Sequence, residues 1–189
     1  MIIGRGAEAV VELKEGVVVK RRIKKNYRHP KIDQKLRFER NRKESRLMQK
    51  VTNIRVPKVI SSKEFEFSME EIKGKRLKER GVKDLSRKIG EVVGELHSQG
   101  IYHGDLTTSN MILSGGEVVL IDFGLSDRGK IEDFATDLKV LFETMNATHD
   151  SFLKPEFFKG YDSKMSKNKE VKNRLKVVYS RGRYLKPNR

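Results

Sequence analysis

The chain of 189 residues contains no cysteine and no long apolar run. Without cysteine it can form no disulfide, no thiolate zinc site and no iron–sulfur cluster, which is compatible with the cytoplasmic location that we expect. No run of eighteen apolar residues is present, so neither a membrane-spanning helix nor a membrane partner is expected. Residues 1–20 lack a basic segment followed by an apolar one, so no signal peptide is expected either.

Acidic residues are also scarce, with 26 Asp and Glu against 42 Lys and Arg and a formal net charge of +16. The excess is concentrated in residues 20–50, with a net charge of +11, and in residues 164–189, with a net charge of +9. Charged runs are usually solvated surface. Concentration of the whole excess in two segments nevertheless favours a polyanionic partner.

Two kinds of pattern divide the chain near Gly74. Short segments with strand-like alternation dominate before it, and helical stripes dominate after it, with helices predicted over 83–99 and 132–146 and a weaker one earlier, over 32–51. We therefore predict an α+β fold with a β-rich N-terminal lobe over 1–73, a mostly helical C-terminal lobe over 74–189, and a cleft between them.

The stretch "HGDLTTSNMILSGGEVVLIDFG" gathers oxygen-bearing side chains around a predicted β-hairpin. "MIL" and "VVLI" flank a Gly-Gly turn, and facing positions of an antiparallel hairpin have a constant index sum. A sum of 232, centred on Gly116, would place Asn110 and Asp122 side by side at the open end, with Asp105 in the loop before them. Two carboxylates and a carboxamide are hard ligands that suit Mg²⁺ carrying a phosphate chain.

The N-terminal segment offers groups that suit phosphate. Gly4-Arg5-Gly6-Ala7-Glu8-Ala9 precedes a predicted strand, and glycines there allow the backbone to approach a phosphate closely. Lys20 ends the apolar run "VVVK" and could be an ordinary strand end. Glu44 could be a surface acid of its helix. Together they could instead form an ion pair that presents Lys20 to phosphate.

In order and spacing these residues resemble the protein-kinase signature: Gly4-x-Gly6, Lys20, Glu44, His103-Gly104-Asp105, Asn110 and Asp122-Phe123-Gly124. "HGDLTTSN" with "IDFGL" resembles the RIO-type atypical kinases. "GAEA", "YRHPKID", "EDFATDLKVL" and "SRGR" extend the resemblance to the small kinases of the KEOPS complex, the archaeal relatives of the p-fifty-three-related kinase.

The resemblance implies a minimal bilobal kinase-like fold and a role for each motif residue. Asp105 would be the catalytic aspartate, and Asn110 and Asp122 would hold Mg²⁺, or Mn²⁺, across the β- and γ-phosphates of ATP. His103 would fix the catalytic loop, as would Asp137, for which an exposed helix acid is the alternative. The residues expected at the ATP site are Gly4, Gly6, Ala7, Glu8, Lys20, Glu44 and a hinge of Met69, Glu70, Glu71 and Ile72.

Three departures from ordinary kinases affect what is expected. Thr107 stands where serine/threonine kinases have a lysine, so transfer is expected to be slower or to need a partner's group. Gly104 replaces the arginine that grips a phosphorylated activation loop, so that form of switching is not expected. The 65 residues after Gly124 contain no Ala-Pro-Glu segment, so the C-terminal lobe is expected to be truncated and to lack a peptide-binding subdomain.

Three functions are therefore weighed. The first is an atypical serine/threonine kinase or ATP hydrolase of the KEOPS complex, which supports threonylcarbamoyladenosine formation in tRNA. Its partners would be the metal-containing tRNA threonylcarbamoyltransferase subunit, the other subunits and tRNA, with contacts expected at Arg181 and Arg183 in a tail hinged at Gly182. The alternatives are a small-molecule phosphotransferase of the aminoglycoside or choline kinase type and a catalytically silent nucleic-acid-binding scaffold.

Overall fold

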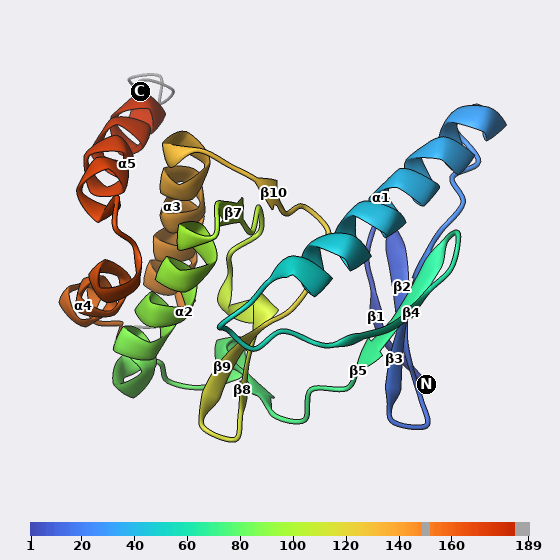
Figure 1. The fold of residues 1–189 in the computed structure, drawn as a ribbon, viewed down its shortest axis with the longest axis horizontal. Coiled ribbons are helices and arrows are strands. Elements are labelled where there is room, and N and C mark those ends of the chain that lie inside the picture. Colours follow the sequence, from blue (N-terminus) through green and yellow to red (C-terminus); the bar gives the residue numbers. More distant parts are fainter. Residues whose placement is uncertain (149–151, 184–189) are drawn as a thin grey trace. The chain divides into compact units, whose positions relative to one another are not determined.

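The computed structural model describes residues 1–148 and 152–183 and shows two compact units (Figure 1). The first unit comprises Met1–Val51 and Val56–Lys73, and the second comprises Thr52–Arg55 and the chain from Gly74 onward. Strands dominate the first unit and helices the second, as the α+β prediction requires. Within the described residues, no helix is both long enough and apolar enough to cross a membrane.

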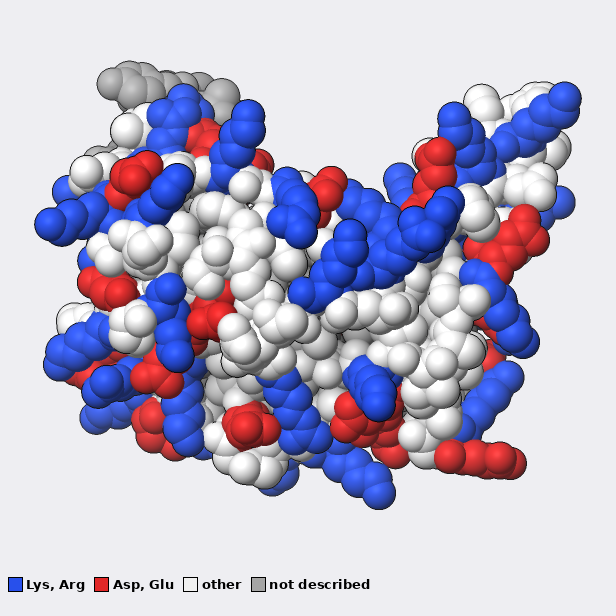
Figure 2. All heavy atoms as spheres, viewed as in Figure 1, with Lys and Arg blue, Asp and Glu red and all other residues white. Residues whose placement is uncertain are grey.

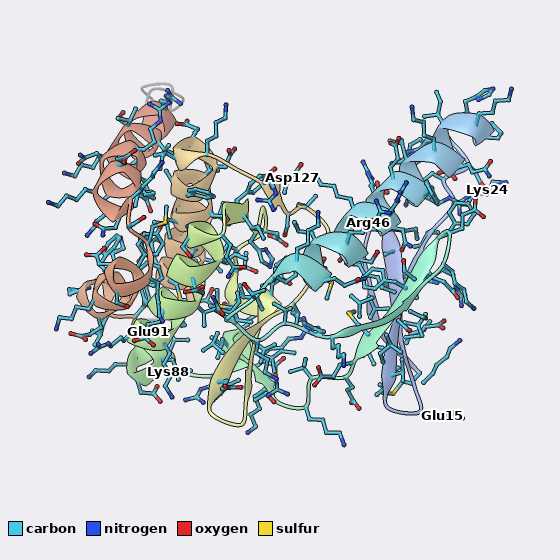
Figure 3. The ribbon with its side chains drawn as sticks, viewed as in Figure 1. Glu15, Lys24, Arg46, Lys88, Glu91 and Asp127 are labelled. Atoms are coloured by element: carbon cyan, nitrogen blue, oxygen red, sulfur yellow. The ribbon has the colours of Figure 1, made fainter. Side chains whose placement is uncertain are left out.

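The first unit is an antiparallel sheet with one helix. Its strands are β1 (Ile2–Arg5), β2 (Ala9–Lys14), β3 (Val17–Arg22), β4 (Val59–Ser62) and β5 (Glu66–Glu70), in the order β1-β2-β3-β5-β4. Helix α1 (Pro30–Lys50) packs against β4 and β5. The tight turn between β2 and β3 carries Glu15 (Figure 3) and Gly16, both with positive φ, as a two-residue hairpin turn needs.

The inward face of helix α1 is largely polar, which explains why the apolar pattern of this segment predicts a helix only weakly. Proline at its first position fits there because it lacks only an N–H that would have no partner in the helix. Near its C-terminal end Leu47 and Met48 are buried, but the residues before them on the inward face are polar. Those buried polar residues are Asp33, Asn41, Glu44 and Ser45. The inward face of α1 is therefore built for ion pairs as much as for apolar packing.

In the described part of the chain, the second unit contains four α-helices and two small sheets. The helices are α2 (Ser86–Ser98), α3 (Ile131–Thr148), α4 (Lys154–Lys164) and α5 (Asn168–Arg183). One sheet has the order β6 (Lys75–Arg76), β8 (Met111–Ser114), β9 (Glu117–Leu120), and β7 (Ile101–Tyr102) pairs with β10 (Asp127–Arg128). Helix α2 packs on α4 and α3 on α5, and the predicted apolar stripe of α3 is buried. That stripe is Phe134, Leu138, Leu141, Phe142 and Met145.

Helices α2 and α4 approach so closely that glycine is needed at their contact. A methyl group at Gly90 would lie 2.0 Å from the carbonyl oxygen of Phe157, and one at Gly160 would lie 2.1 Å from that of Arg87. Both obstacles are backbone atoms, which cannot move aside as a flexible side chain can. The crossing therefore depends on the absence of side chains at both positions.

We expect Gly160→Ala to destabilise the protein by about 1–3 kcal/mol, because the two backbones must separate to admit the methyl group. The melting temperature should fall by roughly 2–4 °C for each kcal/mol lost. Gly81→Ala is the control, since a methyl group at Gly81 meets no atom within 4 Å and the backbone there has no positive φ. Thermal unfolding of both variants checks this, and equal melting temperatures would show that the crossing adapts freely.

The hairpin of β8 and β9 forms around Gly115 and Gly116, but its predicted register is wrong by one residue. Met111 pairs with Leu120 and Ser114 with Glu117, so facing positions sum to 231 instead of 232. Both glycines have positive φ, which makes a two-residue turn whose centre falls between them. Asn110 accordingly faces Ile121, whose amide donates to the Asn110 carbonyl oxygen at 3.0 Å, and Asp122 lies one position further on.

Three other expectations are corrected. Residues 2–5 form β1, so Gly4 lies in a strand opposite Val11 and the glycine loop is shorter than expected. Helix α2 begins at Ser86, after a 3₁₀ turn over Lys83–Leu85, although it ends before Gly100 with φ of +73° as predicted. Helix α5 continues through Arg183, so Gly182 lies within a helix and is not a hinge.

Candidate functional site

In the first unit, Lys20 and Glu44 form a buried ion pair. The ammonium nitrogen of Lys20 on β3 lies 2.6 Å from Oε1 of Glu44 on α1, and the two residues are 5% and 2% exposed. The other oxygen of Glu44 accepts a hydrogen bond from the guanidinium of Arg22, which is 6% exposed. One carboxylate therefore serves two buried cations from the same strand.

The second cation, Arg22, is not among the residues predicted for the site, although a signal for it exists. Side chains two positions apart on a strand share a face, so Arg22 lies on the same face of β3 as Lys20 and Val18. Nε of Arg22 is buried and has no hydrogen-bond partner. The contact with Glu44 is thus what compensates the buried guanidinium.

The glycine loop is held to α1 through Glu8, one of the residues predicted to lie at the ATP site. Its carboxylate pairs with Arg28 at 2.7 Å and with Arg40 of α1 at 2.7 Å. The hydrogen bond from Arg28, together with Arg40, lowers the pKa of Glu8 to about 2. Glu8 therefore stays ionised and ties the loop to the helix that carries Glu44, while Gly6 closes the turn through its amide hydrogen bond to Ala9 O at 2.9 Å.

Only half of the expected hinge lies beyond the sheet. Met69 and Glu70 are the last residues of β5, opposite Val18 and Val17 of β3, and the Glu70 amide donates to Lys58 O at 2.9 Å. Glu71 and Ile72 follow the end of the strand. If a base binds here through main-chain groups, these two residues are the better placed.

In the second unit, Asp105 and Asn110 are joined by hydrogen bonds. The amide nitrogen of Asn110 donates to the Asp105 carboxylate at 2.8 Å and to its backbone oxygen at 2.9 Å. The carbonyl oxygen of the Asn110 side chain is then the atom left for a cation. Asp122 has φ of +62°, uncommon for a residue with a side chain, and its carboxylate accepts the Gly124 amide at 3.2 Å.

The loop that carries Asp105 is anchored by Asp137 of α3. The Asp137 carboxylate accepts the backbone amides of His103 at 2.5 Å and Gly104 at 2.9 Å, and it is 2% exposed. His97 of α2 lies 3.3 Å from the same carboxylate through Nε2, and its Nδ1 lies 2.9 Å from the hydroxyl of Tyr161 on α4. Burial raises the pKa of Tyr161, so its hydroxyl stays neutral. The loop is thus held directly by α3 and, through His97 and Tyr161, indirectly by α2 and α4.

His103 is fully buried and its contacts are compatible with one neutral tautomer. Nε2 lies 3.1 Å from the carbonyl oxygen of Ile121 and must carry the proton, whereas Nδ1 accepts the Asp105 amide at 3.4 Å. Burial lowers the pKa of His103 and favours the neutral ring. The hydroxyl of Ser126 donates to the His103 carbonyl oxygen at 2.7 Å. His103 therefore joins the loop to the segment before Asp122.

Gly104 occupies a position that only glycine suits. Its φ is +81°, and a methyl group there would lie 2.5 Å from the carbonyl oxygen of Leu125. The residue that replaces the kinase arginine is thus required by the backbone on two independent grounds. It also lets the chain present the Gly104 amide to Asp137.

The predicted metal ligands suit a magnesium ion that is shared with a ligand. Within the described ranges, no three His, Cys, Asp or Glu side chains cluster in a way that could hold a metal. Mg²⁺ is usually held in proteins by one or two carboxylates together with substrate phosphates. Asp122 and the side-chain oxygen of Asn110 fit that pattern, whereas a metal cage made wholly of protein does not.

Of the two residues predicted to contact tRNA, Arg181 and Arg183, the structure describes the side chain of Arg181. Arg181 binds Glu132 of α3 at 2.7 Å, a carboxylate that it shares with Arg174, so its guanidinium already has a partner within the chain. The side chain of Arg183 and residues 184–189 lie outside the part of the chain that the structure describes. Within the described residues, the segment expected to form the tail is the end of α5, where Arg181 is engaged.

Comparison with known proteins agrees with this arrangement. Residues 2–171 match the protein kinase domain family. The crystal structure of the Rio2 kinase from Chaetomium thermophilum is similar with a TM-score of 0.67 at 13% identity, over 97% of this chain and 72% of that one. The α+β kinase-like fold that the sequence predicts is thereby confirmed. Fold and site together define a small protein kinase domain.

Proteins similar in sequence identify the family within the protein kinases. A protein of Pyrococcus abyssi named KEOPS complex subunit Bud32 is 39% identical, over 97% of this chain and 96% of its own length. A probable serine/threonine-protein kinase BUD32 homolog of Archaeoglobus fulgidus is 37% identical, over 95% of this chain and 94% of its own length. The chain belongs to the Bud32 family of protein kinases.

Longer relatives carry this domain with further sequence. A probable bifunctional tRNA threonylcarbamoyladenosine biosynthesis protein of Methanosarcina mazei is 44% identical over 193 residues. The match covers 97% of this chain but 35% of that protein. The chain therefore spans about a third of the length of these bifunctional relatives.

Proposed function

We propose that the chain is an Mg²⁺-ATP-dependent atypical serine/threonine kinase or ATPase that acts as a KEOPS subunit in the formation of threonylcarbamoyladenosine in tRNA. The observation that carries the proposal is the anchored loop: Asp137 binds two of its amides while Asn110 binds the Asp105 carboxylate. A catalytic carboxylate needs such fixed orientation. The names of the relatives supply the biological setting.

Each residue has a role in the proposed reaction. Asp105 orients a hydroxyl group or a water molecule and accepts its proton as the oxygen attacks the γ-phosphorus and ADP leaves. Lys20 neutralises charge on the α- and β-phosphates. Asn110 and Asp122 would hold Mg²⁺, which would supply positive charge to neutralise the transferred phosphoryl group. Thr107 supplies no positive charge where ordinary kinases have lysine, so slow turnover by the isolated chain is expected.

Partner subunits are expected to supply the positive charge that is missing at Thr107 and to control turnover. We propose the metal-containing threonylcarbamoyltransferase subunit as the neighbour that controls turnover, together with the other KEOPS subunits. Transfer of the phosphoryl group to a serine hydroxyl would give a phosphoprotein, and transfer to water would release inorganic phosphate.

One experiment tests the proposal and separates these outcomes. Release of inorganic phosphate and transfer of labelled phosphate to protein are measured for the chain alone, with tRNA, and with the transferase subunit, against Asp105→Asn in each condition. We expect Mg²⁺-dependent turnover that partners raise and that Asp105→Asn removes. If the wild type and Asp105→Asn are equally inactive in every condition, the chain is a silent scaffold and the proposal fails.

A further inference from the structure

Helix α1 presents a strongly basic outer face, which we define by six exposed cations. They are Lys31, Lys35, Arg42, Lys43, Arg46 and Lys50. Glu39 is the one exposed acid of this helix. Figure 2 shows Lys and Arg atoms gathered over α1, and Figure 3 shows Arg46 on it.

The helix is basic outside because its other acids face inward. Asp33 pairs with Arg37 at 2.7 Å, and Glu44 pairs with Lys20 and Arg22 of the sheet. Both acids are almost fully buried, so they screen the outer face little. The charges of Asp33 and Glu44 are therefore taken up by ion pairs on the inner side of α1 and do little for the cations outside.

Most of the outer cations have no carboxylate of their own. Among the described residues, no acid forms an ion pair with Lys31, Arg42, Arg46 or Lys50. Lys35 lies 3.9 Å from Glu39, and both side chains are more than half exposed, so that pair is weak. The face therefore retains a net positive charge that an anionic partner could compensate.

The cations form a row along the helix. Five of them, Lys31, Lys35, Arg42, Arg46 and Lys50, are successively four or seven residues apart, spacings that return to one face of an α-helix, and Lys43 lies beside this row. At 1.5 Å per residue, Lys31 and Lys50 are about 28 Å apart along the axis. A row of this length can follow several consecutive phosphates of a nucleic acid, whereas a single phosphate group would need only a small part of it.

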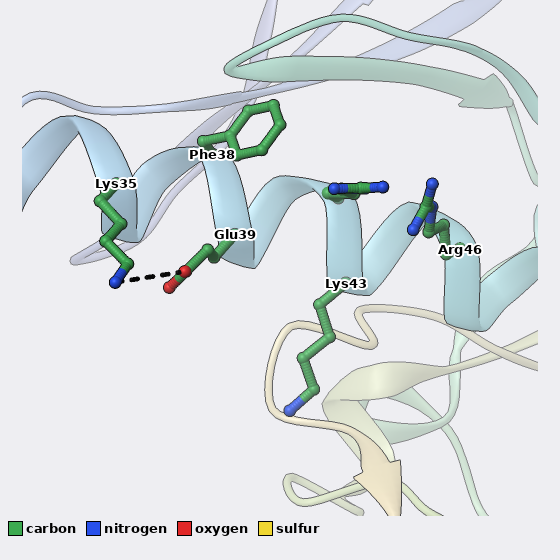
Figure 4. A pocket seen from close by; sticks show the side chains of 6 residues that line it. Lys35, Phe38, Glu39, Lys43 and Arg46 are labelled. Carbon is green, nitrogen blue, oxygen red and sulfur yellow. Dashed lines mark ion pairs between the residues drawn. The ribbon is translucent and has the colours of Figure 1, made fainter.

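An exposed aromatic ring lies within the row. Phe38 is 39% exposed, and the guanidinium carbon of Arg42 lies 5.8 Å from its ring centroid. These residues border a surface hollow of about 380 Å³ whose lining also includes Lys35 and Arg46 (Figure 4). Aromatic rings between cations are what proteins use to stack the unpaired bases of single-stranded nucleic acid.

The other basic segment has less free charge. On α5, Arg174 and Arg181 both bind Glu132, and Lys172 lies 2.6 Å from Asp162. Two carboxylates therefore offset part of the charge of three cations on α5. This comparison favours α1 over the C-terminal segment, where the sequence led us to expect tRNA contacts at Arg181 and Arg183.

We propose that the outer face of α1 binds the phosphate backbone of RNA and that Phe38 stacks on an unpaired base. The choice of tRNA as the natural RNA rests on the proposed function, but binding itself does not depend on phosphoryl transfer. The contact is electrostatic and tolerant of sequence, and it weakens steeply with salt.

The test uses the full chain with an unmodified tRNA, at several salt concentrations. Arg42→Gln/Arg46→Gln is compared with Lys169→Gln/Lys176→Gln, which removes the same charge from α5. We expect the α1 pair to lose tenfold or more in affinity, with a salt slope smaller by about 1.4–1.8 for two lost phosphate contacts. The α5 pair should change affinity less than threefold. Equal losses, or no loss in either pair, would overturn the proposal.

Two further measurements test the stacking of Phe38 and separate RNA binding from the proposed ATP turnover. Phe38→Ala should weaken binding of a single-stranded oligonucleotide by about tenfold and binding of a fully paired duplex little, because only unpaired bases can stack. If both ligands are affected equally, the stacking part is wrong. ATP turnover without RNA should be the same in wild type and Arg42→Gln/Arg46→Gln. Absent turnover with intact RNA binding would reject the proposed function alone.

Discussion

Replacing Asp122 with asparagine is expected to lower Mg²⁺-dependent ATP turnover by about a thousandfold while the protein stays folded. Loss of a metal-bound carboxylate removes several kcal/mol of transition-state stabilisation, and each 1.36 kcal/mol, approximately, is a factor of ten. Asparagine is preferred to alanine because Asp122 has φ of +62°, which asparagine tolerates and alanine does not. A loss caused by an altered backbone is thus kept apart from a loss caused by the missing charge.

The measurement combines turnover with ligand binding. The Mg²⁺ dependence of ATP affinity should disappear in Asp122→Asn, since the asparagine carries no charge to hold the ion. Asp84→Asn, which changes an exposed aspartate paired with Arg80, is the matched control and should behave as wild type. Turnover that survives in Asp122→Asn would remove this residue from the site.

The largest effect on folding stability is expected at Glu44. Glu44→Gln should reduce the free energy of unfolding by about 3–5 kcal/mol, the usual cost of removing one partner from a buried ion pair. The change withdraws the carboxylate from the Arg22 guanidinium, whose Nε is already without a partner, and from Lys20. A drop of this size is a large part of the stability of an ordinary domain.

A matched control is the exposed ion pair between Arg21 of β3 and Glu66 of β5. Arg21 faces away from Lys20 and Arg22 and pairs with Glu66 at 3.0 Å, where the Arg21 side chain is half exposed. Glu66→Gln should therefore cost about 1 kcal/mol or less. Urea unfolding of both variants distinguishes them, and equal costs would mean that burial of the Glu44 cluster carries no energetic weight.

The same cluster allows a test of catalytic coupling. If Glu44 acts by positioning Lys20, then Lys20→Met and Glu44→Gln should impair the same step, and the double variant should lose less activity than the sum of the two effects. Turnover is measured at temperatures where all three variants remain folded. Additive losses would leave Glu44 with a purely structural role.

Local patterns predicted the elements of this fold better than their register. The stripe of Phe134, Leu138 and Leu141 was sufficient to predict α3, because burial of one helix face leaves a 3.6-residue period. The Gly115-Gly116 turn was likewise sufficient to predict a hairpin. Composition could not decide whether the turn has two or three residues, and that single residue moves every facing pair by one position.

In the candidate site, too, local patterns predict some residues and miss others. Motif order brings Lys20 and Glu44 together as candidates, and strand alternation could have added Arg22. No pattern in the sequence links Tyr161 to the loop, since its hydroxyl meets His97 across 64 positions through the packing of α4 on α2. Such contacts arise from tertiary packing and leave no periodic pattern in the sequence that could predict them.

The geometry of Gly104 also bears on how this branch of kinases can evolve. In many kinases the corresponding arginine lets a phosphorylated loop act as an activating signal. Here a codon change to arginine would have to overcome both the positive φ and the Leu125 carbonyl oxygen 2.5 Å from the new Cβ atom. A backbone shift that relieved this clash would also disturb the hydrogen bond from the residue-104 amide to Asp137. A single change at position 104 is therefore not enough to give this loop phosphorylation-dependent activation.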